Sequence, residues 1–316
     1  MNNNKFNIIW QKYGTFGILL LMILILGILS PAFFFTGSNL TQVILQSSIN
    51  IIVGVGEFFP ILIAGIDLSV GSIMALTGLI TAKLLLMGVP VILAILLGGI
   101  ILGAALGFIN GFLIVKTNLH PFIITLGTLS IFRGLTLIIS DARPVFGLPQ
   151  EFTLGVAGWI WFVPIPVIIA IGLAVLLTFV TNKTKMGRNI YALGGNSQAA
   201  WFSGINVKLH TIVVFIISGV CAGIAGVVLT ARLGAAEPLA GTGFELFAIA
   251  AAIIGGTSFF GGKGKIAGVI MGALIIGVIN NGLNILNVST YYQQIVMGTL
   301  IIGAVALDSF FAGKKA

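Results

Sequence analysis

Long and nearly uncharged apolar stretches follow one another along almost the whole chain. Each covers about 20 residues, the length that an α-helix needs to cross the hydrocarbon core of a bilayer. Of the 316 residues, 58% are hydrophobic and only 7% are charged, whereas a soluble domain is about 45–50% apolar and about 25% charged. A soluble fold of this composition would have almost no charged surface, so the sequence predicts an all-α polytopic protein of a lipid bilayer.

Ten stretches are candidates for transmembrane helices. The segments 70–87 and 246–260 are the weakest, because both are short and both adjoin glycine-rich residues, where transporter helices tend to break. The first segment is too long for a signal peptide and is interpreted as an uncleaved helix. The ten segments are roughly 15–34, 42–64, 70–87, 89–115, 121–140, 158–180, 211–230, 246–260, 266–285 and 292–312.

The basic residues predict the orientation of these ten segments. If both ends of the chain are cytoplasmic, the outer loops carry only two basic residues, Arg143 and Arg232. Cytoplasmic loops of membrane proteins collect Lys and Arg, so this asymmetry favours ten spans with both termini inside. The net charge of +8 is then a topological signal and does not indicate nucleic acid. The inner loops carry Lys5, Lys12, Lys116, Lys183, Lys185, Arg188, Lys208, Lys263, Lys265, Lys314 and Lys315.

A faint internal repeat divides the chain. The motif Gly-Phe-Ile-Asn-Gly at 107–111 returns as Gly-Val-Ile-Asn-Asn-Gly at 277–282, and the two Asn residues, Asn110 and Asn280, are 170 positions apart. An odd number of predicted helices separates the copies, so they would cross the membrane in opposite directions. Inverted repeats are typical of transporters. The alternative is chance similarity between glycine-rich helices.

The longest polar stretch, about 181–210, is predicted to face the cytoplasm. Asn196 is a suitable N-cap for a short helix over 197–202, and Gly204 is a suitable C-terminal stop. From the residues alone, two interpretations stay open. The stretch docks into a groove of a soluble partner, or it is a passive basic loop.

Ionisable residues are rare inside the predicted spans, where they are costly. Glu57 and Arg133 are two of them. One interpretation places them on a polar pathway as partners, and the other gives them structural roles. The chain lacks a phosphate-binding loop, since the nearest stretch, 261–265, has the wrong spacing. Its one cysteine, Cys221, and its two histidines argue against a Cys- or His-rich metal site.

Three ordered segments resemble one known family. Residues 65–72, Gly-Ile-Asp-Leu-Ser-Val-Gly-Ser, resemble the signature of the ribose/galactose/xylose class of ATP-binding-cassette sugar permeases. Residues 191–205 are similar to the cytoplasmic coupling segment of that class, and residues 254–284 to its C-terminal half. Within the class, residues 56–59 and 231–241 most resemble the permeases for D-allose.

The resemblance implies that residues 1–316 form one transmembrane permease domain in the inner (plasma) membrane. It implies a homodimer with a separate ATPase subunit and a periplasmic binding protein, which delivers a monosaccharide, D-allose or a ribose-like sugar. The chain itself would not be an enzyme and would bind no cofactor, since ATP and Mg would be held by the partner subunit. Two alternatives are an ion-coupled secondary sugar transporter and a membrane-embedded regulatory subunit.

The resemblance also implies two groups of site residues. Asp67 has two interpretations: it caps the following helix by accepting the amide hydrogen of Val70, or it contacts the sugar or a partner. The residues implied in coupling to the ATPase are Gly194, Gly195, Asn196, Ala199, Ala200, Ser203 and Gly204. The residues implied in the signature or the pathway are Glu57, Gly65, Asp67, Ser69, Gly71, Ser72 and Asn280.

Overall fold

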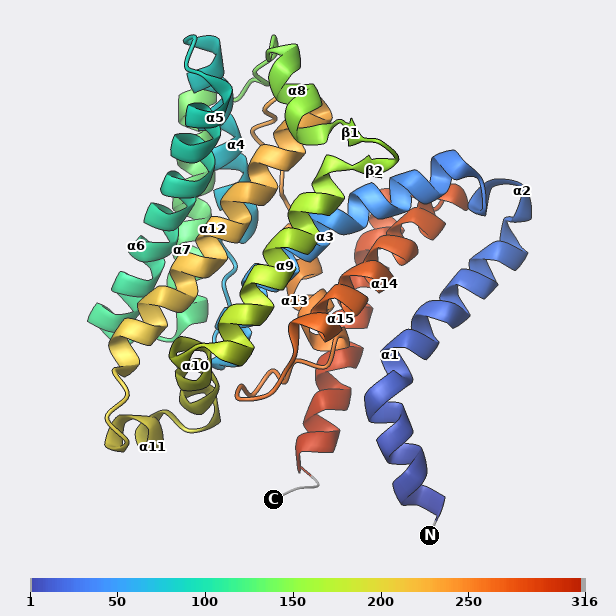
Figure 1. Cartoon of the computed structure of the whole chain (residues 1–316), viewed down its shortest axis with the longest axis vertical. Helices are drawn as coiled ribbons and strands as arrows, with labels where there is room; N and C mark the ends of the chain where they lie inside the picture. Colours follow the sequence, from blue (N-terminus) through green and yellow to red (C-terminus); the bar gives the residue numbers. More distant parts are fainter. Residues whose placement is uncertain (1, 314–316) are drawn as a thin grey trace.

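The computed structural model describes residues 2–313, with side chains at 14–306, 308 and 309. Over these residues the chain is helical apart from one small hairpin (Figure 1). The elements are α1 (Asn2–Leu29), α2 (Pro31–Phe34), α3 (Gly37–Leu62), α4 (Val70–Leu86), α5 (Val91–Ala94), the π-helix η1 (Ile95–Ile101), α6 (Leu102–Thr117), α7 (Pro121–Ser140), α8 (Gln150–Ala157), β1 (Trp159–Ile160), β2 (Val163–Pro164), α9 (Ile165–Lys183), α10 (Lys185–Gly195), α11 (Ser197–Phe202), α12 (Val207–Leu233), α13 (Phe244–Ile254), α14 (Ile266–Ile285) and α15 (Thr290–Gly313).

Each of the ten predicted segments coincides with a helix of the structure. Six helices are long and apolar enough to cross a membrane: α3, the continuous helix 91–117, α7, α9, α12 and α14. Three shorter apolar helices, 14–29, α4 and α13, match the first, third and eighth segments. The tenth segment matches α15, whose last side chains lie outside the described ones. That all ten cross the bilayer remains a prediction.

Three predicted segments extend several residues beyond the helix that they match. The first segment is broken because Ser30, which precedes Pro31, has a non-helical backbone with φ −141° and ψ 62°, so that α1 ends at Leu29. The sixth begins with the hairpin β1–β2, and its helix starts only at Ile165. The eighth ends six residues early, because Gly256 adopts φ +84° directly after the last turn of α13.

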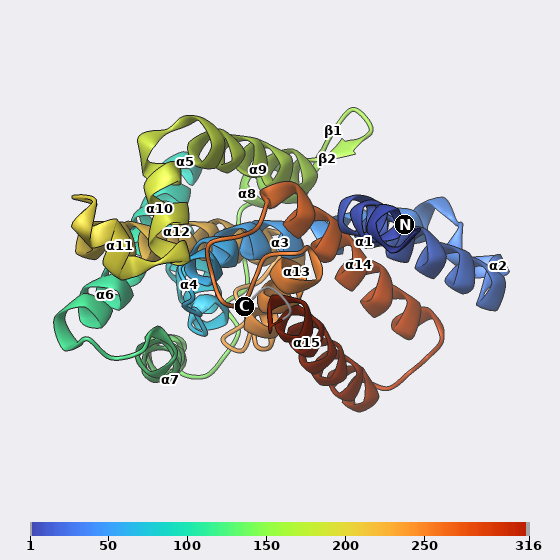
Figure 2. The same cartoon turned by 90° about the horizontal axis from the view of Figure 1, so that it is seen from below.

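The helix α3 lies at the centre of the bundle (Figure 2). All its residues from Ser47 to Leu62 are buried, and α9, α12, α13 and α14 pack around it. Close packing elsewhere depends on glycine, as lipid-embedded helices commonly require. A Cβ atom on Gly107 of α6 would overlap the carbonyl oxygen of Phe215 on α12.

The contacts between helices fix their relative directions. Gln42 near the start of α3 bonds to Arg232 near the end of α12, and Gly56 meets Cys221, so α3 and α12 are antiparallel. The start of α1, the end of α15 and the pair α10–α11 all lie at one end of the bundle (Figure 1). This arrangement agrees with the predicted order of spans. Lys314 and Lys315 of the charge pattern lie outside the described residues, as do the side chains of Lys5 and Lys12.

Candidate functional site

The chain between α3 and α4 is a non-helical break over residues 63–69, in which Gly65, Asp67 and Ser69 are buried while Ala64 is exposed. Pro60 stands in the last turn of α3, and its carbonyl accepts the amide hydrogen of Gly65 at 2.8 Å. Ala64 has φ +58°, which turns the chain back toward the helix. Glu57 of α3 then accepts the amide hydrogen of Asp67 at 2.9 Å. The break therefore packs against the carboxyl group of Glu57, which lies about one and a half turns before the end of α3.

Asp67 does not cap the helix as predicted. Instead of the Val70 amide, its Oδ1 accepts the Ser69 amide hydrogen at 3.0 Å and also the Ser69 hydroxyl. This is a local turn of the kind that Asp often makes two residues ahead. Ser69 rather than Asp67 occupies the N-cap position of α4.

Two distant helices complete this cluster. Ser218 of α12 donates to Asp67 Oδ2 at 2.9 Å, and Asn110 of α6 donates to the Ser69 hydroxyl at 2.7 Å. The five residues Glu57, Asp67, Ser69, Asn110 and Ser218 are all fully buried, and are called the signature network below. The network joins three helices and the break at one point inside the bundle.

Sequence reasoning found three members of the network and missed two. Asn110 was noticed only as part of the repeat, and Ser218 was not noticed, although polar side chains in apolar helices are a usable signal. Asn280 is also buried but makes none of the network's hydrogen bonds among the described residues.

The remaining signature residues shape the surroundings of the network. Gly65 packs against Pro121 of α7, and Ser72 donates to the Ser69 carbonyl at 2.8 Å. Gly71 faces the segment 238–241, since a Cβ atom there would overlap the carbonyl oxygen of Gly241.

Two polar atoms of the network, Glu57 Oε2 and Asn110 Oδ1, have no hydrogen-bond partner in the described part of the chain. Buried polar atoms are nearly always bonded, so an unpartnered acceptor calls for an explanation. Within the described residues, no Lys or Arg side chain bonds to either carboxyl group of the network. The site can accept further hydrogen bonds, and it offers no cation to an anionic ligand.

Arg133 is not a partner of Glu57, which contradicts the interpretation of the two as a pathway pair. Its guanidinium donates to the carbonyls of Pro238 at 2.7 Å, Ala240 at 2.9 Å and Gly71 at 3.3 Å. Arg133 of α7 thus links the loop between α12 and α13 to α4. The structural interpretation of Arg133 is therefore favoured.

The predicted short helix over 197–202 is confirmed as α11. Asn196 caps it by accepting the amide hydrogen of Ala199 at 2.9 Å. Gly204 ends it with φ +78°, and the Ile205 amide bonds back to Ala200 at 3.0 Å, which is the usual glycine-terminated helix end. Ala200 is buried and the Ser203 hydroxyl donates to Ala199.

Two aromatic side chains project from the end of α11. Trp201 is 63% exposed and Phe202 is 79% exposed, and their rings meet edge to face. Exposed aromatic side chains that cluster on a surface often mark an interaction site.

The helix α10 connects this surface to the end of α3. Gly194 packs against the carbonyl of Leu62, the last residue of α3, and the same carbonyl accepts the Gly262 amide hydrogen at 2.8 Å. Tyr191 donates to the Gly264 carbonyl at 2.8 Å. Burial raises the pKa of the Tyr191 phenol, which keeps it protonated as a donor. Gly195, by contrast, has open space in its Cβ direction.

A bundle of apolar helices around a central helix that ends at a buried polar network is typical of a multi-pass membrane protein. Residues 39–305 match the family model described as branched-chain amino acid transport system / permease component. The chain belongs to this family. Membership and the six long apolar helices confirm the predicted location in the inner (plasma) membrane.

The relatives confirm the resemblance drawn from the three sequence segments. The D-allose transport system permease protein of Escherichia coli (strain K12) is 62% identical, over 96% of this chain and 93% of its own length. The ribose import permease protein of Bacillus subtilis (strain 168) is 44% identical, over 96% and 94%. The L-arabinose transport system permease protein of E. coli (strain K12) is 35% identical, over 97% and 93%. No solved structure matches the chain.

Proposed function

We propose that this chain is the membrane permease of an ATP-binding-cassette importer that moves a monosaccharide, D-allose or a ribose-like sugar, into the cytoplasm. The observation that carries the proposal is the 62% identity, over 96% of the chain, to a protein named for D-allose transport. Two copies form the pathway, and a periplasmic binding protein delivers the sugar. ATP and Mg are bound by a separate ATPase subunit, and this chain binds no cofactor and catalyses no reaction.

The contacts of α10 and α11 support a mechanical role. The exposed pair Trp201 and Phe202 forms the surface that meets the ATPase. Movement of α11 reaches α3 through α10, because Gly194 contacts the Leu62 carbonyl. Since α3 and the break after it carry the signature network, a displacement at the ATPase would reach the centre of the bundle through a short chain of direct contacts.

The proposal is tested by uptake into proteoliposomes that contain the permease, its ATPase and its binding protein. Uptake of D-allose or D-ribose is expected only with ATP inside and all three components present. Uptake by this chain alone, driven by an ion gradient without ATP, would show that the secondary-transporter alternative is correct.

Coupling is tested at the cap of α11. Asn196→Ala removes the bond to the Ala199 amide and is expected to lower the sugar transported per ATP hydrolysed. The matched control is Asn206→Ala, because Asn206 caps α12 with the same geometry, at 3.0 Å from the Leu209 amide. Equal effects of the two substitutions, or unchanged uptake in Asn196→Ala, would contradict the coupling assignment.

A further inference from the structure

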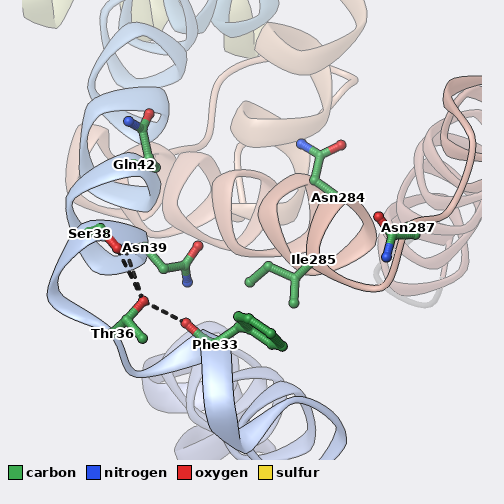
Figure 3. A pocket seen from close by; sticks show the side chains of 8 residues that line it. All are labelled: Phe33, Thr36, Ser38, Asn39, Gln42, Asn284, Ile285 and Asn287. Carbon is green, nitrogen blue, oxygen red and sulfur yellow. Dashed lines mark hydrogen bonds between the residues drawn. The ribbon is translucent and has the colours of Figure 1, made fainter.

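A polar cavity opens between α2, α3 and α14 (Figure 3). These elements meet at the end of the bundle opposite α10 and α11 (Figure 1). Its volume is about 500 Å³, and an adjoining hollow of about 340 Å³ shares part of its lining. Ligand pockets commonly measure about 300–1,000 Å³. The side chains lining the two hollows are Phe33, Thr36, Ser38, Asn39, Gln42, Gln46, Asn281, Asn284, Ile285 and Asn287.

Carboxamide groups dominate this cavity, and several keep unused donors. Asn39 and Asn281 bond reciprocally, at 3.2 and 2.7 Å, and so join α3 to α14. The oxygen of Gln42 accepts from Arg232, and that of Asn284 accepts from Gln293. These two bonds leave the NH₂ groups of Gln42 and Asn284 available, since each amide nitrogen has two donor hydrogens.

The lining selects for a neutral polyhydroxylated molecule. None of the ten lining side chains is ionisable, and the cation beside them, Arg232, donates to the Gln42 oxygen at 3.0 Å, so the lining itself offers no ion-pair partner to a phosphate, a carboxylate or an amine. Hydroxyl groups can both donate to and accept from carboxamides. Phe33, 67% exposed beside Ile285 (Figure 3), supplies an apolar face for the carbon skeleton of such a ligand.

A stripe of polar side chains on one face of α3 runs from the cavity toward the signature network. Asn39, Gln42, Gln46, Asn50 and Glu57 fall within about a third of the helix circumference at 3.6 residues per turn. From Asn39 to Glu57 the helix rises about 27 Å, most of the thickness of a bilayer core. Asn50 is fully buried, and neither its oxygen nor its nitrogen has a hydrogen-bond partner among the residues that the structure describes.

We propose that this cavity binds the transported monosaccharide through its hydroxyl groups, and that Asn50 is the next polar contact on the way to the signature network. The inference rests on the proposed function and adds the site at which the sugar first meets the permease. The unpartnered carboxamide of Asn50 would bond to the sugar as it passes, since nothing else in the described structure satisfies it.

The first experiment is protection from thiol labelling in the assembled transporter. The only native cysteine, Cys221, is buried, so a cysteine introduced by Gln46→Cys or Asn284→Cys is the site that a water-soluble thiol reagent reaches. Millimolar D-allose or D-ribose is expected to slow labelling at both positions at least threefold. Gln150→Cys, exposed on α8 outside the cavity, is the matched control, and its labelling should not change.

The second experiment replaces Asn50 with leucine. Removing an unpartnered buried amide does not lower stability by itself, so a purely structural role predicts unchanged thermal unfolding and unchanged uptake. The proposed role predicts unchanged unfolding, at least a tenfold loss of sugar uptake, and ATPase stimulation by the binding protein within about twofold of wild type.

The outcomes separate this inference from the proposed function. If the wild-type transporter takes up a sugar that protects neither Gln46→Cys nor Asn284→Cys, the cavity is not its binding site. Full uptake by Asn50→Leu would remove Asn50 from the path. If the wild-type assembly takes up neither sugar, the proposed function fails, whereas protection in the labelling experiment would still support the cavity as a sugar site.

Discussion

The two neighbouring glycines at the end of α10 should respond in opposite ways to the same substitution. A Cβ atom on Gly194 would overlap the Leu62 carbonyl oxygen and lie 2.6 Å from the Gly262 nitrogen, both of them backbone atoms. A Cβ atom on Gly195 meets nothing within 4 Å. The pair therefore provides a perturbation and its matched control one residue apart.

The magnitude follows from the contacts. Overpacking against backbone costs about 1–3 kcal/mol, and separating Gly262 from Leu62 would lose a hydrogen bond worth about 0.5–1.5 kcal/mol. Gly194→Ala should then lower the free energy of unfolding by about 2–4 kcal/mol. Gly195→Ala should leave it unchanged or raise it by up to about 1 kcal/mol, because Ala is the better helix former.

Thermal unfolding of the purified permease in detergent measures both variants under one condition. Uptake by the assembled transporter should be impaired in Gly194→Ala, because α10 can no longer pack against the end of α3. Equal stability of the two variants would refute the contact between α10 and α3, and with it the proposed route from the ATPase to the signature network.

Three further variants test other parts of the structure. Asp67→Leu leaves two hydroxyls and one amide of the network without an acceptor, so we expect the free energy of unfolding to fall by about 3 kcal/mol or more. The assay is the aggregation temperature in detergent, which should be lower. A fall of less than about 1 kcal/mol would contradict the network. Arg133→Met removes three hydrogen bonds and should speed hydrogen exchange in residues 236–243 at least tenfold, while exchange elsewhere stays the same. Replacing Trp201 and Phe202 together by alanine should change the free energy of unfolding by less than about 0.5 kcal/mol. It should weaken binding of the ATPase about 30-fold or more, the effect of losing a hot spot of about 2 kcal/mol. Unchanged binding would show that this surface does not meet the ATPase.

Local signals in the sequence predicted the features that depend on local physics. Runs of about 20 apolar residues placed every long helix within a few positions, and Asn196 and Gly204 predicted both ends of α11. These features depend on transfer into lipid and on backbone capping, which act over a few residues. The prediction failed where a backbone detail interrupts an apolar run, as at Ser30 and in the hairpin that starts at Trp159.

Features that depend on distant residues were not visible in the sequence. Asp67 was expected to bond forward to Val70, but Ser218, 151 positions away, competes for its other oxygen. The polar cavity combines the starts of α2 and α3 with the end of α14, and no local pattern pairs segments so far apart. The π-helix η1 likewise has no local signal in its Leu- and Gly-rich sequence.

The faint repeat is the exception, because a single offset of 170 residues relates whole helices. Shifted by this offset, α3 (Gly37–Leu62) falls on α12 (Val207–Leu233), and α4 falls on α13 with its preceding turn. The helix 91–117 falls on α14, and α7 falls on α15. The repeated motifs in the sequence are short, whereas the offset relates four helices of the first half to four of the second.

The packing of the two halves supports an inverted repeat over chance similarity. Helices α3 and α12 are related by the offset and run antiparallel in contact, as Gln42 with Arg232 and Gly56 with Cys221 show. A two-fold axis between halves brings equivalent residues together where it passes close to the chain. Gly71 and Gly241 are 170 positions apart, and a Cβ atom on either would press on the carbonyl of the other. The axis therefore passes beside the start of α4, two residues from Ser69 of the signature network. The break in the first half thus lies at the interface with the second half. Transporters built from inverted repeats place their substrate path at this interface.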